Sequence, residues 1–128
     1  MRAALFRWHN RRIDPELLNL TQPTELRTFP KGRFELYRIG PATIGRATYE
    51  PGWRWSEHVG AAAGERLCQI EHVGLVQSGS AVAAMEEGTE IVMRAGDLFY
   101  IPPGHDSWVL GDEPYVSLHI LGGEDYAT

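Results

Sequence analysis

The fold is decided by residues 96–105, whose sequence is GDLFYIPPGH. Gly96 can adopt the positive φ that a tight turn before a strand requires, and an apolar strand follows it. Pro102 and Pro103 fix φ and remove two amide donors, so the strand cannot continue past them. We therefore predict the rim of a β-barrel here, with His105 at its mouth rather than in the hydrogen-bonded ladder.

Short runs rich in β-branched and aromatic residues recur along the chain, separated by glycine and proline turns. We predict strands at 34–39, 42–49, 53–58, 68–77, 81–85, 90–93, 97–101, 107–110 and 115–121. This spacing is typical of an all-β sandwich or barrel, and no long helical period competes with it. Residues 14–18 favour a short N-terminal helix, because Asp14 can cap it and Pro15 suits its first position. Residues 59–64, with three consecutive alanines, fit either a helical turn or a loop.

Composition and charge indicate one soluble domain. The 128 residues are 43% hydrophobic and 23% charged, and no apolar run is long enough to cross a bilayer. A net charge of -5 offers no basic field for a phosphate backbone, so neither a nucleic-acid partner nor a membrane is expected. The single cysteine agrees with a reducing compartment, which favours the cytoplasm. We divide the chain into a tail with a short helix, residues 1–24, and one domain, residues 25–128.

Most of the chain after residue 24 resembles the cupin superfamily, small double-stranded β-helix (jelly-roll) barrels with a metal or ligand site in the mouth. The second cupin motif, Gly, five residues and Pro-x-Gly, is matched by Gly96, Pro102 and Gly104. The first motif begins with Gly, five residues and His, which Gly52 and His58 match. The stretches GWRWSEH and PPGHDSW also resemble a bacterial cupin subgroup. The resemblance implies an all-β jelly-roll barrel.

Three positions depart from the cupin pattern. His72 stands where the first motif has its glutamate. Gly60 and Ser107 occupy the places of the second histidine of the first motif and the histidine of the second motif. A three-His, one-Glu metal centre therefore cannot be carried over, and the histidines left for a centre are His58, His72 and the displaced His105.

We predict that His58, His72 and His105 hold a divalent transition metal, because converging neutral imidazoles suit Zn, Fe, Ni or Cu. The alternative is that each is a hydrogen-bonded core residue. Cys68 is a further possible ligand, although a small buried hydrophobe is its commoner role. On one regular strand Cys68 and His72 would lie about 13 Å apart, so they could share an ion only if Gly74 or a bulge bends the strand.

The alternation of side chains along a strand gives two further expectations. His119 lies in a run whose more apolar face includes Val116 and Leu118, so we expect its ring to point to solvent or an interface. His105 and Ser107 are two residues apart, so we expect them on one face, with His105 one layer nearer the mouth.

Three tryptophans and an arginine flank the histidine positions. Trp53, Trp55 and Trp108 are predicted to line a small-molecule pocket, with core filling as the alternative for at least one of them. Arg54 could pair with a charged substrate, or be solvated. Asp106 could orient an imidazole or make a local turn, and the second role is favoured.

Two functions remain. The first is a metal-dependent cupin enzyme acting on a small organic molecule, and the second is a non-catalytic cupin that binds a small ligand as a sensor or carrier. We also expect a homodimer, with residues 34–49 as the pairing segment, because the edges of a β-sandwich need cover.

Overall fold

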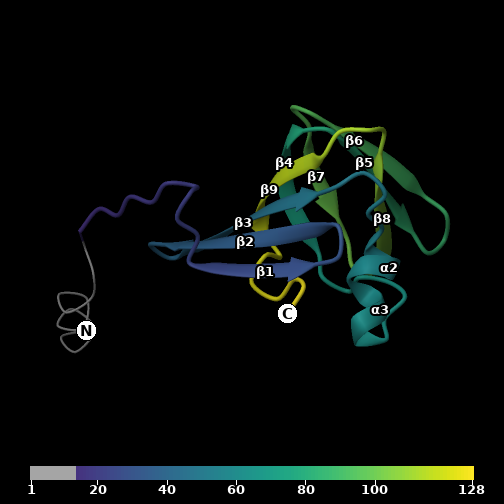
Figure 1. Cartoon of the computed structure of the whole chain (residues 1–128), viewed down its shortest axis with the longest axis horizontal. Coiled ribbons are helices and arrows are strands. Elements are labelled where there is room, and N and C mark those ends of the chain that lie inside the picture. The colour runs from purple at the N-terminus through teal and green to yellow at the C-terminus, as the bar shows by residue number, and fades with distance from the viewer. Residues whose placement is uncertain (1–13) are drawn as a thin grey trace, which may run out of the picture.

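Residues 14–128 of the computed structural model form two antiparallel β-sheets and two short helices. The larger sheet has the order β1 (Glu25–Phe29), β2 (Gly32–Ile39), β3 (Ala42–Tyr49), β9 (Tyr115–Leu121), β4 (His72–Ser78), β7 (Leu98–Ile101). The smaller sheet has the order β6 (Glu90–Arg94), β5 (Ser80–Met85), β8 (His105–Leu110). The helices α2 (Trp55–His58) and α3 (Gly60–Ala63) lie together at one end of the sheets (Figure 1).

One hydrophobic core lies between the two sheets, and large aromatic side chains make up much of it. Phe34 is fully buried, and its ring occupies the place that a side chain at Gly45 would need. Tyr49 stacks on Trp53 with ring centroids 3.7 Å apart and planes at 4°. Full burial of one such side chain stabilises the fold by about 1.5–3 kcal/mol, so these rings contribute to the core that borders the site described below.

The stretch that decides the fold behaves largely as its sequence predicts. Gly96 has φ 93°, and β7 ends at Ile101, directly before the two prolines. His105, however, opens β8 and pairs with Met85, so the expectation that it lies outside a ladder is wrong. The proline corner ends one strand, and the next begins within four residues.

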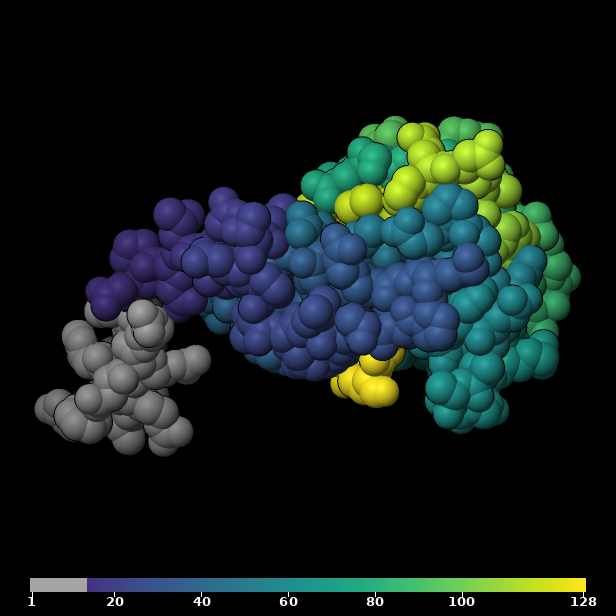
Figure 2. All heavy atoms as spheres, in the orientation of Figure 1, coloured from purple at the N-terminus to yellow at the C-terminus, as the bar shows by residue number. Residues whose placement is uncertain are grey.

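The helical predictions have mixed outcomes. Residues 14–24 contain no helix, and in Figure 2 their purple end projects from the body of the protein as an arm. Residues 59–64 take the helical alternative as α3. The predicted strand at 53–58 is wrong: Arg54 makes an isolated bridge to Trp108, and α2 follows.

Distant contacts explain why α2 replaces a strand. The Asp106 carboxylate accepts hydrogen bonds from the backbone N–H of Ser56 at 3.0 Å and from its hydroxyl at 2.8 Å. These contacts satisfy polar groups in the first turn that a helix leaves without intrahelical partners. The Asp106 carboxylate also accepts from the Ser107 N–H at 2.9 Å, which confirms the favoured local bond, and within residues 14–128 it has no hydrogen bond to an imidazole.

The sheet edges differ from expectation. The segment proposed for dimer pairing forms β2 and β3, each of which has strand partners on both sides. That assignment is wrong, since β1 and β7 are the edge strands of the larger sheet. The all-β class is confirmed, whereas strand pairing that would close the two sheets into one barrel is not seen in residues 14–128.

Candidate metal centre and ligand pocket

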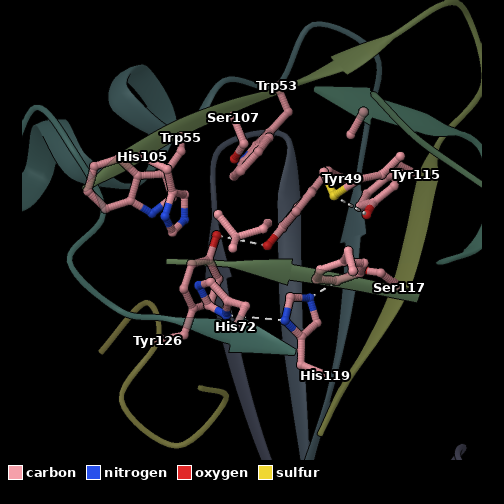
Figure 3. Close-up of a pocket in the computed structure, with 14 residues that line it drawn as sticks. Tyr49, Trp53, Trp55, His72, His105, Ser107, Tyr115, Ser117, His119 and Tyr126 are labelled. Carbon is pink, nitrogen blue, oxygen red and sulfur yellow. Dashed lines mark hydrogen bonds between the residues drawn. The ribbon is translucent and has the colours of Figure 1, made fainter. Parts of the chain in front are cut away.

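A small cavity lies between the two sheets, and we call it the inner cavity (Figure 3). Its volume is about 30 Å³, which is room for one or two water molecules and too little for an organic substrate. The residues that line it are Tyr49, Trp53, Trp55, His72, Ala81, Met93, Phe99, Ile101, His105, Ser107, Tyr115, Ser117, His119 and Tyr126. Three imidazoles therefore face one largely aromatic chamber.

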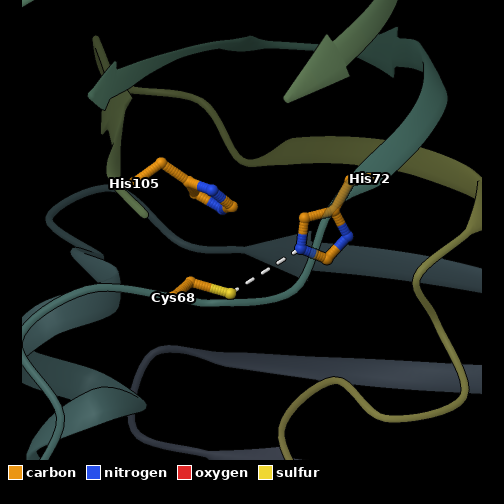
Figure 4. Close-up of side chains that lie close together, drawn as sticks. All are labelled: Cys68, His72 and His105. Carbon is orange, nitrogen blue, oxygen red and sulfur yellow. Dashed lines mark hydrogen bonds between the residues drawn. The ribbon is translucent and has the colours of Figure 1, made fainter. Parts of the chain in front are cut away.

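A cluster of possible metal ligands lies at the border of this cavity (Figure 4). One ligand atom each from Cys68, His72 and His105 lies within 4.8 Å of the other two. The Cys68 Sγ is 3.8 Å from the His72 Nε2. All three residues are buried, so an ion among them would be shielded from water.

The backbone brings Cys68 to the histidines in a way that the sequence pattern did not predict. The strand β4 begins at His72, so Cys68 is not on it. Cys68 instead makes an isolated bridge to His105, and its N–H donates to the His105 carbonyl at 2.7 Å. The predicted continuous strand 68–77 is therefore wrong, and with it the spacing of about 13 Å between the two side chains.

His105 presents a free lone pair to the cluster. Its Nδ1 lies 2.7 Å from the Pro102 carbonyl. A carbonyl only accepts, so Nδ1 carries the proton and Nε2 is left unprotonated. Burial lowers the pKa of His105, which keeps the ring neutral. A backbone carbonyl on the far nitrogen is the usual way in which proteins orient a metal-binding histidine.

His72 is linked to a second buried histidine. Its Nδ1 is 3.3 Å from the Nδ1 of His119, and the Nε2 of His119 is 3.0 Å from the Ser117 hydroxyl. The expectation that His119 points away from the site is wrong: it faces the inner cavity, together with Ser117. Burial, reinforced by the neighbouring imidazoles, lowers the pKa of His72 to about 2, and burial lowers that of His119 to about 4. Both rings are neutral at physiological pH.

Burial has the opposite effect on the thiol. It raises the pKa of Cys68 to about 11, so the residue is a protonated thiol when nothing is bound. Ligation through its sulfur requires that this proton leave.

His58 is not brought together with His72 and His105. Its Nδ1 lies 2.9 Å from the Arg54 backbone nitrogen and 3.1 Å from the Arg54 carbonyl oxygen. Both contacts of His58 are therefore with the backbone of Arg54, and the ring is not part of the ligand cluster. Its side chain lines a second pocket, described below.

The four predicted ligand-binding residues separate into two pairs. Trp53 and Trp55 line the inner cavity, and their buried Nε1 donors have no hydrogen-bond partner among the described residues. Arg54 lies 4.2 Å over the Trp108 ring and pairs with Asp106 at 3.2 Å. Arg54 and Trp108 thus engage each other and line neither pocket.

Positions 60 and 107, where the cupin motifs have histidines, have distinct structural roles here. A side chain at Gly60 would collide with the Trp55 ring and with the Glu65 carbonyl. Ser107 lines the inner cavity on the same face as His105, as the alternation predicts. A ligand could not be accommodated at residue 60 without moving Trp55.

The second pocket, which we call the outer pocket, has a volume of about 490 Å³. Its walls are the end of β1, the two helices, residues 67–70 and the C-terminal residues 125–128. Cys68 lines this pocket, whereas Trp55 and Tyr126 line both it and the inner cavity. The ligand cluster therefore lies at the border between a water-sized chamber and a pocket large enough for an organic molecule.

Several solved structures resemble this one. A protein of unknown function from Rhizobium leguminosarum has a TM-score of 0.60 at 15% identity, over 85% of this chain and 97% of its own. A cupin-superfamily sugar phosphate isomerase from Silicibacter pomeroyi has a TM-score of 0.58 at 18% identity, over 81% of this chain and 73% of its own. The chain has the cupin fold. The polyketide cyclase RemF from Streptomyces resistomycificus also matches, with a TM-score of 0.60 at 12% identity, over 83% of this chain and 78% of its own.

No family model matches this cupin-fold chain, and no curated protein matches it. The similar structures carry different activities in their names, so the cupin fold alone does not select one. Within residues 14–128, no helix has the length and apolar character that crossing a membrane requires.

Proposed function

We propose that this cupin-fold protein binds a divalent transition metal through Cys68, His72 and His105 and acts on a small organic molecule held in the outer pocket. One observation carries the proposal: three buried ligand atoms of types that transition metals prefer lie within 4.8 Å of one another.

The donor set fits such an ion. The His105 Nε2 is unprotonated, and the His72 Nε2 already faces the sulfur. Two imidazoles and one thiol suit zinc or copper better than calcium or magnesium, which prefer oxygen ligands. Three protein ligands also leave a position open, as in catalytic zinc sites. Zinc is the first candidate, and Fe, Ni and Cu are the others.

Other residues of the site would bind water and the organic molecule next to the ion. A bound ion would supply a Lewis-acidic position for water or substrate. The inner cavity holds water-sized groups, and the Trp53 and Trp55 rings form part of its wall. Trp55 and Tyr126 separate this chamber from the outer pocket, so an organic molecule reaches the cluster from the Cys68 side.

The alternative function is a cupin that binds a small ligand without metal. A specific observation favours it: His72 already has a polar neighbour at each nitrogen, the Cys68 sulfur at 3.8 Å and His119 at 3.3 Å. A buried histidine satisfied on both sides is also what a purely structural network contains.

Metal analysis of protein purified without an affinity tag decides between these functions. We expect about one equivalent of a transition metal, lost in Cys68→Ser and His72→Ala because each removes a ligand. His58→Ala is the matched control and should retain the metal, since His58 lies outside the cluster. If the wild-type protein contains no metal and takes up none from added zinc, the metal-binding function is refuted and binding of a small ligand without metal remains.

A further inference from the structure

The outer pocket has a charge pattern that restricts what it can bind. Its charged lining residues are two carboxylates, Glu65 and Asp125, and no lysine or arginine of residues 14–128 lines it. Neither carboxylate forms an ion pair with another described residue. Within residues 14–128, the negative charge at this pocket is therefore not neutralised by an ion pair.

Most of the remaining lining is apolar. Side chains from three separate parts of the chain contribute, among them Phe29, Val59, Ala62, Leu67 and Ile70. Small residues on α3 keep the volume open, since Ala62 and Ala63 both line it. A pocket of about 490 Å³ is within the size range of small-molecule sites, which are mostly apolar with a few polar groups.

The arginines near the pocket are already engaged. Arg27 donates to the backbone carbonyls of Gly123, Glu124 and Tyr126 at 3.2, 2.8 and 2.7 Å, which anchors the C-terminal wall. Arg54 is held by Asp106 and by the Trp108 ring. A phosphate or carboxylate in the pocket would thus meet two acidic side chains and, among the described residues of the lining, no lysine or arginine.

We propose that the outer pocket binds a small, mainly apolar molecule that carries a positive charge or none, and that it rejects phosphates and carboxylates. This inference rests on the proposed function only in placing the molecule beside Cys68. It separates the protein from the sugar phosphate isomerase that shares its fold, because that enzyme's substrate class is anionic. The His58 imidazole is a polar group in the lining that a hydroxyl or carbonyl of the ligand could contact.

Three probes of matched shape test the inference: benzylamine, benzyl alcohol and benzoate. They are titrated into the isotope-labelled protein as purified, at low salt, while amide NMR shifts of residues 58–70 and 125–128 are followed. We expect benzylamine to bind about tenfold more tightly than benzoate, with benzyl alcohol between them, because two carboxylates several ångströms away act through water. The difference should shrink as salt is added.

Variants connect the preference to the named residues. Glu65→Gln combined with Asp125→Asn should make the three affinities similar, whereas Glu113→Gln, an exposed carboxylate that lines neither pocket, should leave the order unchanged. Ala62→Trp should weaken all three probes by filling the pocket. Benzoate binding as tightly as benzylamine would overturn the inference, as would a preference that survives the double substitution or probes that shift no pocket amide. Metal content is measured on the same samples, so charge selectivity without metal would refute the proposed metal centre and leave this inference standing.

Discussion

Replacing His119 with phenylalanine is expected to weaken zinc binding by about tenfold, although His119 is not in the ligand cluster. The new ring has similar shape and meets aromatic neighbours, because the rings of Phe34 and Phe99 lie 5.3 and 5.5 Å from the ring of His119. The substitution removes the nitrogen that lies 3.3 Å from the His72 Nδ1. It thus tests the hydrogen bond with little change in packing.

The magnitude follows from where His72 must carry its proton. If Nε2 binds the ion, the proton is on Nδ1, and that buried N–H then has no acceptor among the described residues once His119 is replaced. An unsatisfied buried donor costs about 1–3 kcal/mol. The 3.3 Å contact is long for a hydrogen bond, so the lower part of this range applies. About 1.4 kcal/mol corresponds to a tenfold change in affinity.

Competition titration against a chromophoric zinc chelator measures this change. Ser117→Ala should weaken zinc binding less, because its hydroxyl contacts His119 and not His72. Ser107→Ala is the control, since Ser107 lines the same cavity without a hydrogen bond to a histidine in the described residues. If His119→Phe binds zinc as tightly as the wild type, or if Ser107→Ala loses as much affinity as His119→Phe, the reasoning fails.

Three further predictions concern the pH dependence of stability, position 60 and the exposed edge of the larger sheet. In metal-free protein, folding lowers the pKa of His72 from 6.5 to about 2 and that of His119 from 6.5 to about 4. Below pH 6.5 the unfolded chain therefore binds protons that the folded protein does not, and the free energy of unfolding falls as the pH is lowered. Urea unfolding should show a loss of about 2–4 kcal/mol from there to about pH 5, and a flat profile would contradict the assignment. Gly60→His should cost about 1–3 kcal/mol in thermal unfolding and should not tighten zinc binding, because the new side chain meets the Trp55 ring; tighter zinc binding would show that the position can hold a ligand. We still expect a homodimer and place the contact on the edge strand β7, where Leu98 is 79% exposed; light scattering should give a dimer of the 14.3 kDa chain that Leu98→Glu dissociates, and a monomeric wild type would refute this expectation.

Local signals in the sequence predicted the fold where local contacts determine it. The turn at Gly96 and the end of β7 at Ile101 depend on the conformations of glycine and proline, which act within a few residues. The helix α2 escaped prediction because the carboxylate that caps Ser56 comes from Asp106, 50 residues away. The strand β1 was missed as well: its burial alternates only between intermediate and exposed, and its ladder to β2 is a tertiary contact.

The prediction of which face of β9 is buried is wrong for a different reason. The sequence predicts that the more apolar face is buried, yet Ser117 and His119 point inward and Leu118 points outward. The rule that apolar residues face the core applies where the core is packed solid, and this face lines a cavity with polar groups instead. A polar residue at every second position of an otherwise apolar strand was the available signal for a lined cavity.

The candidate centre uses residues at other positions than the histidines of the cupin motifs, and one of them, Cys68, lines the outer pocket. Position 107 faces the inner cavity as a serine, whereas His105, on the same face, is itself the residue that bridges to Cys68. Cys68 lines the outer pocket, so a centre built on this bridge meets the larger space directly. Position 60 is simultaneously lost as a ligand, because Trp55 needs its volume to form the wall between the two spaces. Gly60 thus leaves room for the Trp55 ring between the two spaces, and a histidine at position 60 would have to displace that ring.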